Sequence, residues 1–137
     1  LVGSEMCIRE GAIKFRGKSI YDEKWLLGSL IKIEEDRYAV IPNLNDIEIG
    51  KSIGLYEVYS ETVGQFTGLF DKNGKEIYEG DILNNGQRNY FVCWNSERGA
   101  WWLKNKDLIY TTPLGFLSIE LFVVGNIYDN PDLIKEE

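Results

Sequence analysis

The sequence predicts a mainly β protein, either a small SH3-like barrel or two packed antiparallel sheets, that ends in a short helical turn. Three observations support this prediction. Apolar and polar residues alternate along most of the chain, turns rich in glycine, asparagine and aspartate interrupt the alternation, and no long helical pattern occurs. Period-two alternation places successive side chains on opposite faces of a strand. Short strands joined by frequent turns favour barrels and paired sheets.

The first half of the chain contains four segments with this pattern. Strands are expected over residues 12–16, 25–33, 38–41 and 53–59. In the second segment, Ile31 and Ile33 alternate with polar neighbours, so we expect both to be buried. Pro42 ends the third strand because it has no N–H to donate to a neighbouring strand. The stretch 42–50 is the best candidate for a long exposed loop or a join between subdomains.

The second half continues in the same way. Strands are expected over residues 64–70, 76–78, 81–83, 89–94, 100–103 and 117–123. Asn73-Gly74 suits a tight hairpin turn, since both residue types adopt positive φ. The run 89–94 is almost entirely apolar and is expected to be covered on both faces. The last strand is expected to place four apolar side chains on one face: Leu117, Ile119, Leu121 and Val123.

A short helical turn is expected at the end, with Asn130 as its N-cap and Pro131 in its first position. This turn would carry Leu133 and Ile134 back onto the sheet.

The start of the chain does not resemble part of a fold. Residues 1–5, which precede Met6, resemble the remnant of an expression tag and lack the features of a signal peptide. Residues 6–137 are expected to form a single β domain, with possible subdomains at 6–60 and 61–137.

Composition narrows the classes of function. The chain has 22 acidic and 15 basic residues, a formal net charge of −7 and no histidine. Without histidine, Ser-His-Asp or Cys-His catalysis, histidine-based zinc sites and imidazole proton transfer are excluded. The acidic balance argues against nucleic-acid binding, which relies on basic side chains that neutralise phosphates. We therefore expect neither enzymatic activity nor a cofactor.

The two cysteines, Cys7 and Cys93, form neither a disulfide framework nor a CxxC pair. This favours a reduced, cytosolic setting. No apolar run approaches the roughly 18 residues that span a bilayer, so no membrane association is expected. Cys93 lies within an apolar run and is expected to act as an inert small hydrophobe.

The first candidate binding group is basic. Lys14, Arg16 and Lys18 share one face of an extended strand and form a cluster with Arg9. This cluster suits phosphate or an acidic partner. An ordinary solvated strand face is the default interpretation.

The second candidate group is aromatic. It consists of Tyr90, Phe91, Trp94, Trp101 and Trp102. Trp101 and Trp102 are adjacent in an expected strand, so they must face opposite sides of the sheet. One is expected in the core, and the other is exposed, covered by a loop or available for an interface.

A group of acids gives a third, weaker signal. It consists of Asp71, Glu76, Glu79 and Asp81. Acids at this spacing can bind a divalent cation or act as general acid and base. However, a calcium loop needs glycine at its sixth position, and Gly74 is only the fourth residue counted from Asp71. Turn formation is the preferred interpretation, and no catalytic or metal-binding residue is assigned.

Several motifs together resemble the YopX family of phage and prophage proteins. They are Ile13 to Lys18, Trp25 with Gly28, Glu61 to Leu69, Asp71 to Ile82 and Val124 to Leu133. The resemblance covers most of the chain, in order, and implies a mainly β fold and an origin in phage or prophage genomes of Gram-positive bacteria. It implies no particular activity, so no catalytic residues are carried over.

The leading hypothesis is a non-enzymatic phage accessory protein that binds a host or phage macromolecule and forms a homo-oligomer. Two alternatives remain open. One is a nucleic-acid-binding barrel that uses the basic face from Arg9 to Lys18, and the other is a metal-assisted enzyme built on the acids from Asp71 to Asp81.

Overall fold

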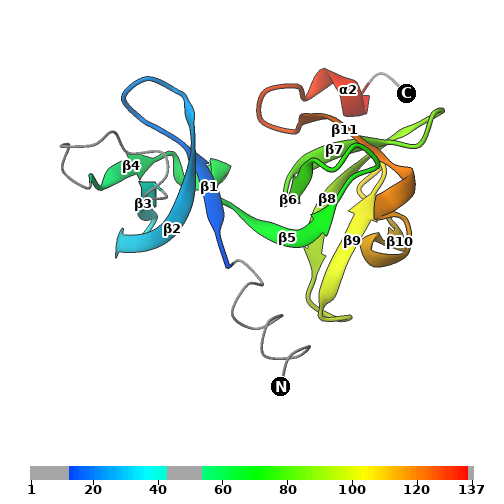
Figure 1. Cartoon of the computed structure of the whole chain (residues 1–137), viewed down its shortest axis with the longest axis horizontal. Coiled ribbons are helices and arrows are strands. Elements are labelled where there is room, and N and C mark those ends of the chain that lie inside the picture. The colour runs from blue at the N-terminus through cyan, green and yellow to red at the C-terminus, as the bar shows by residue number, and fades with distance from the viewer. Residues whose placement is uncertain (1–12, 43–53, 136–137) are drawn as a thin grey trace. The chain divides into compact units, whose positions relative to one another are not determined.

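The computed structural model describes residues 13–42 and 54–135, and the chain divides into two compact units, residues 1–66 and 67–137. The described strands form two antiparallel sheets, in the orders β4-β3-β2-β1-β5-β6 and β10-β9-β8-β7-β11 (Figure 1). Within the described residues neither sheet closes into a barrel. The prediction of a mainly β fold is therefore confirmed in its two-sheet form.

The strands in chain order are β1 (Phe15–Lys18), β2 (Trp25–Glu34), β3 (Arg37–Pro42), β4 (Tyr56–Val58), β5 (Gly64–Phe70), β6 (Glu76–Tyr78), β7 (Asp81–Asn84), β8 (Asn89–Asn95), β9 (Ala100–Lys104), β10 (Tyr110–Pro113) and β11 (Phe122–Asn126). Short 3₁₀ turns lie at Ser60–Thr62, Leu114–Phe116 and Ser118–Glu120, and the helix α2 spans Asp132–Lys135.

The first unit contains β1 to β4 and the beginning of β5. β2 and β3 form a hairpin in which Gly28 packs directly against the backbone of β3. A Cβ added at this position would lie only 1.9 Å from the carbonyl oxygen of Ile41. Arg37 joins β3 to β4 through two contacts with Glu57, Nε–Oε2 at 3.1 Å and Nη2–Oε1 at 2.8 Å. The close approach of the β3 backbone explains why a glycine, Gly28, occurs within β2.

In the second unit, β7 to β10 form a meander and β11 returns beside β7. Gly74 adopts a φ of +80° in the turn between β5 and β6, as the Asn73-Gly74 pair predicts. The predicted C-terminal helical turn is also confirmed. Its Ile134 is buried, and the Asn89 side-chain amide donates to the carbonyl of Leu133 at 2.8 Å.

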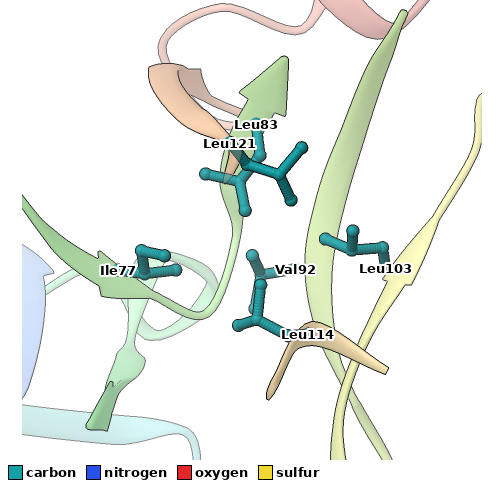
Figure 2. Packing of buried hydrophobic residues seen from close by; sticks show 6 residues of the cluster. All are labelled: Ile77, Leu83, Val92, Leu103, Leu114 and Leu121. Atoms are coloured by element: carbon teal, nitrogen blue, oxygen red, sulfur yellow. The ribbon is translucent and has the colours of Figure 1, made fainter. Parts of the chain in front are cut away.

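The core of the second unit is one aliphatic cluster (Figure 2). Each member is at most 3% exposed: Ile77, Leu83, Val92, Leu103, Leu114 and Leu121. These side chains come from four different strands and from the segment between β10 and β11. Burying them stabilises the unit by about 1.5–3 kcal/mol per side chain relative to exposure.

The burial predicted for β2 is wrong. Ile31 and Ile33 are 38% and 41% exposed. Alternation shows which side chains share a face, but not whether a second layer covers that face.

The strand predicted over residues 117–123 is also wrong in its first part. Two 3₁₀ turns occupy this region, and β11 begins only at Phe122. Backbone N–H groups here donate to carbonyls three residues earlier, at 2.9 to 3.3 Å. Alternate positions therefore no longer share a face, so Leu121 is 3% exposed whereas Ile119 is 73% exposed.

These two neighbours provide a matched test. We expect Leu121→Ala to lower the free energy of unfolding by about 2–5 kcal/mol, because it leaves a cavity in the core. Ile119→Ala should change it by less than about 0.5 kcal/mol, because that side chain lies in solvent. Urea unfolding followed by circular dichroism measures both, and equal losses would support the continuous strand instead.

Candidate functional site

The predicted basic residues of β1 lie against aromatic rings. Arg16 is only 8% exposed, and its Cζ lies 4.7 Å from the ring centroid of Trp25. Lys18 Nζ approaches the same ring at 5.8 Å, and Lys14 Nζ lies 5.0 Å from the ring of Phe66. In such cation–π contacts the positive charges are attracted to aromatic rings of the same fold.

This placement corrects the expectation of a solvated basic strand face. Arg16 is buried, so its guanidinium does not present a charge to a partner at the surface. Lys14 and Lys18 are half-buried, and Arg9 lies outside the described residues. A binding role for the cluster stays a prediction, and the burial of Arg16 weighs against it.

The first unit also contains an aromatic hollow of about 770 Å³. Its lining residues are Ser19, Tyr21, Asp22, Trp25, Leu26, Leu27, Pro42, Leu55 and Tyr56. Three of them are exposed to solvent: Tyr21 at 73%, Leu55 at 54% and Tyr56 at 43%. Exposed aromatic and aliphatic side chains that gather in one place are typical of an interaction surface.

In the second unit, strand pairing separates two faces of the five-stranded sheet. Val92 and Leu103 are paired and lie on the core face. Their neighbours, Cys93 paired with Trp102, must therefore lie on the opposite face. Trp101 packs against the core, as predicted for one of the two adjacent tryptophans.

The outward-facing residues and the adjacent turn form a distinct surface, which we name the aromatic–basic face. It consists of Phe91, Cys93, Arg98, Trp102, Lys104 and Tyr110. Tyr110 contacts Trp102 edge-on, with ring centroids 6.0 Å apart, and its hydroxyl donates to the carbonyl of Trp94 at 3.2 Å. The half-buried ring of Trp102 and the exposed ring of Tyr110 are thus held in place by the fold.

Two cations lie over these rings. Lys104 Nζ is 4.5 Å from the ring centroid of Tyr110, and Arg98 Cζ is 5.7 Å from that of Trp102. The helix α2 packs against β8, where the Asn89 side chain donates to the carbonyl of Leu133. The face stays open toward β10, where Tyr110 is 39% exposed.

The prediction that residues 89–94 are covered on both faces is wrong. β8 forms as expected, but Trp94 is 46% exposed, and Phe91 and Cys93 are only half-buried. An apolar run indicates a strand, but here solvent reaches both faces, because the exposed Trp94 lies on the same face as Val92 and the half-buried Phe91 and Cys93 lie on the other.

A smaller polar hollow lies at the end of the β8–β9 pair that is remote from Arg98. It has a volume of about 260 Å³ and is lined by Arg88, Tyr90, Asn105, Lys106, Asp107 and Thr111. Basic groups therefore occur at both ends of these two strands.

Asp71 and Asp81 use their carboxylates to hold the backbone. Asp71 Oδ1 accepts from the N–H groups of Asn73 and Lys75, both at 2.8 Å, and Oδ2 accepts from that of Val123 at 2.9 Å. Asp81 Oδ2 accepts from the N–H of Tyr78 at 2.7 Å. These contacts support the interpretation of the acids as turn-forming residues.

The electrostatics of Asp71 follow from this geometry. Burial by itself raises the pKa of the carboxyl, but the three backbone N–H groups outweigh burial and hold the pKa below its usual value. Among the described residues no group of three or more acids and cysteines is arranged to hold a metal ion.

Cys93 lies on the aromatic–basic face but has a thiol of low acidity. Burial raises the pKa of Cys93, and nearby Lys104 and the hydroxyl of Tyr110 only partly oppose that effect. Its Sγ lies 3.7 Å from the carbonyl oxygen of Trp102. This environment fits the inert thiol that the sequence predicts.

Sequence reasoning found Trp102 but missed its partners. Arg98, Lys104 and Tyr110 lie up to 12 positions apart in sequence, and only the pairing of β9 with β8 and β10 brings them together. One signal was present. Residues 88–113 contain four basic and two acidic side chains in an otherwise strongly acidic chain.

The comparisons with known proteins agree with this two-sheet class of β protein. A family model described as YopX protein matches residues 14–135. The chain therefore belongs to the YopX family. The crystal structure of protein EF1440 from Enterococcus faecalis is similar, with 25% sequence identity, a TM-score of 0.56, and coverage of 90% of this chain and 98% of that chain. The comparison with curated proteins gave no match.

The family resemblance based on the sequence motifs is thus confirmed. None of the helices in the described parts of the chain has the length and apolar character of a membrane span.

Asp71 is the first residue to test in this region. We expect Asp71→Asn to lower the free energy of unfolding by about 1–3 kcal/mol, because an amide nitrogen would face one of the backbone donors. Because the folded pKa is depressed, the charge of Asp71 stabilises the protein fully above the unfolded pKa of about 3.9. This stabilisation is lost as the pH falls through the folded value.

Urea unfolding at neutral and acid pH measures both effects. The exposed Asp107→Asn serves as a control and should behave like the parent protein. If Asp71→Asn were as stable as the parent at neutral pH, the carboxylate would not support the turn.

Cys93 is expected to react slowly with thiol reagents. In a Cys7→Ser background, alkylation by iodoacetamide at pH 7 should be slower than that of free cysteine, whose pKa is about 8.5, because less thiolate is present. The rate should rise with pH beyond the point at which free cysteine levels off. A rate at pH 7 equal to or above that of free cysteine would contradict the raised pKa.

Proposed function

We propose that this YopX-family protein is a non-enzymatic phage or prophage accessory protein that acts in the bacterial cytoplasm by binding another macromolecule. The aromatic–basic face is the observation that carries the proposal. It combines tryptophan, tyrosine and arginine, the residue types enriched at binding hot spots. Rings that are already held by neighbours lose little conformational freedom on binding.

The non-enzymatic part rests on the chemistry of the chain. Histidine is absent from the sequence, Asp71 and Asp81 use their oxygens for backbone hydrogen bonds, and burial raises the pKa of Cys93. The groups best suited to proton transfer or nucleophilic attack are therefore missing, engaged or weakly ionised.

The proposal is tested by capturing partners from lysogenic or infected cells with the tagged protein and with Arg98→Glu/Lys104→Glu. We expect a partner that the parent protein retains and the variant loses at least tenfold, because the variant reverses both charges over the rings. Lys24→Glu/Lys135→Glu, which makes the same change in net charge at exposed positions outside the face, should retain the partner. If all three proteins captured the same amount of the partner, the aromatic–basic face would not be the binding surface.

We also propose that the protein forms a homo-oligomer through the hollow of the first unit. Its support is the exposure of Tyr21, Leu55 and Tyr56 around one aromatic cavity.

Size-exclusion chromatography with light scattering tests this part. We expect a mass that is a multiple of 15.8 kDa. Tyr21→Ser/Leu55→Ser should shift the mass toward the monomer, whereas Ile119→Ser, an exposed site in the second unit, should not. A parent protein that is monomeric throughout the micromolar range would refute oligomerisation.

A further inference from the structure

We infer that the macromolecule bound at the aromatic–basic face is a single-stranded nucleic acid. The inference rests on the proposed function, because it names the partner of the same surface. Single strands are bound by rings that stack on bases together with cations that follow the phosphates. Trp102 and Tyr110 supply rings, and Arg98 and Lys104 supply cations, all within one strand-paired patch.

The charge distribution supports this partner despite a net charge of −7. The segment 88–113, which forms β8 to β10 and their turns, carries four basic and two acidic residues, so it is locally positive. Charges further away than the Debye length of about 8 Å are largely screened at physiological salt. A bound strand would therefore respond mainly to charges near the face, which include the acidic Glu79 close to Cys93 as well as the basic residues of this segment.

The positions of the cations define a direction for the bound strand. Arg98 lies in the turn at one end of the β8–β9 pair, and the hollow with Arg88 and Lys106 lies at the other end. Lys104 lies near that second end, at the last residue of β9. β8 spans seven residues, about 20 Å. On the aromatic–basic face itself, Arg98 and Lys104 thus place cations near the two ends of the β8–β9 pair, while the hollow with Arg88 and Lys106 also contains Asp107 and the core-facing Tyr90.

The outer edge of the same sheet argues against the main competing partner, an extended acidic peptide that adds as a further strand. β10 and β11 are the two edge strands, and the register of each is interrupted, between Tyr110 and Thr112 and between Val123 and Gly125. β10 ends at Pro113, which has no N–H. Bulges and proline at an edge prevent regular strand addition. The rings and cations of the open face therefore suit bases and phosphates better than a peptide backbone.

Fluorescence polarisation with labelled oligo(dT) and oligo(rU) tests the inference. The oligonucleotides are about 15 nucleotides long, because known single-strand sites cover about 4–16 nucleotides. We expect binding at low salt that weakens as salt rises. The slope of log K against log salt should be about −1.4 if two phosphates are neutralised and about −2.8 if four are.

The variants separate stacking from charge. Trp102→Ala should weaken binding about 5- to 150-fold through the loss of base stacking, with an almost unchanged salt slope. Arg98→Glu/Lys104→Glu should weaken it at least tenfold and make the slope shallower. Lys24→Glu/Lys135→Glu should remain within about twofold of the parent, since it alters net charge equally. Circular dichroism melts verify that each variant is folded, and Tyr110→Ser replaces Trp102→Ala if the latter is not.

Three results would overturn the inference. They are no polarisation change for the parent protein at low salt, equal weakening by the control pair, and equal affinity for a duplex of the same length. If no oligonucleotide binds while a captured protein still depends on Arg98 and Lys104, the inference fails and the proposed function stands. If neither a nucleic acid nor a protein depends on the face, both fail.

Discussion

The second unit depends on one buried carboxylate. Asp71 binds three backbone N–H groups, two in its own turn and one at Val123 in β11, which is 52 positions later in the chain. The N–H of Lys72 adds a bond to the carbonyl of Leu121, a core residue. Together these hydrogen bonds fix the turn after β5 and at the same time hold β11 in its place beside β7. An unpaired backbone donor at this position would be expensive because the site excludes water.

The basic residues of β1 likewise make contacts within the fold. Arg16 and Lys18 approach the ring of Trp25, and Lys14 approaches that of Phe66. A cation over an aromatic face is stabilised by the ring quadrupole, and more strongly when it is removed from water. On β9 and β10 the same pairing occurs at an open surface, where Arg98 and Lys104 cover rings that a partner can still reach. Burial therefore distinguishes Arg16, whose contact is inside the fold, from Arg98 and Tyr110, which are exposed on the candidate binding surface.

The strand β2 and the segment before β11 show how far a local sequence pattern predicts the structure. Alternation correctly indicated β2 and β5, an apolar run correctly indicated β8, and Asn73-Gly74 correctly indicated a turn. It failed at Ile31 and Ile33, where a strand forms but its face is exposed. It failed again before Phe122, where 3₁₀ hydrogen bonds replace the strand. In the first case the decisive factor is whether a segment distant in sequence covers the strand, which a local pattern does not contain. In the second case it is a set of local 3₁₀ hydrogen bonds, which alternation does not distinguish from strand pairing.

By itself the sequence determined the fold class, the turn positions and the placement of Trp101 and Trp102 on opposite faces, because these follow from residue periodicity and from the backbone preferences of glycine and asparagine. The family was indicated by motifs that resemble the YopX family, and the family model confirms it. Only the tertiary structure decided that Arg16 is buried, that Asp71 holds β11, and that Arg98, Lys104 and Tyr110 gather around Trp102. The physical reason is strand register. Which side chains become neighbours across a sheet is fixed by hydrogen bonds between segments far apart in the chain.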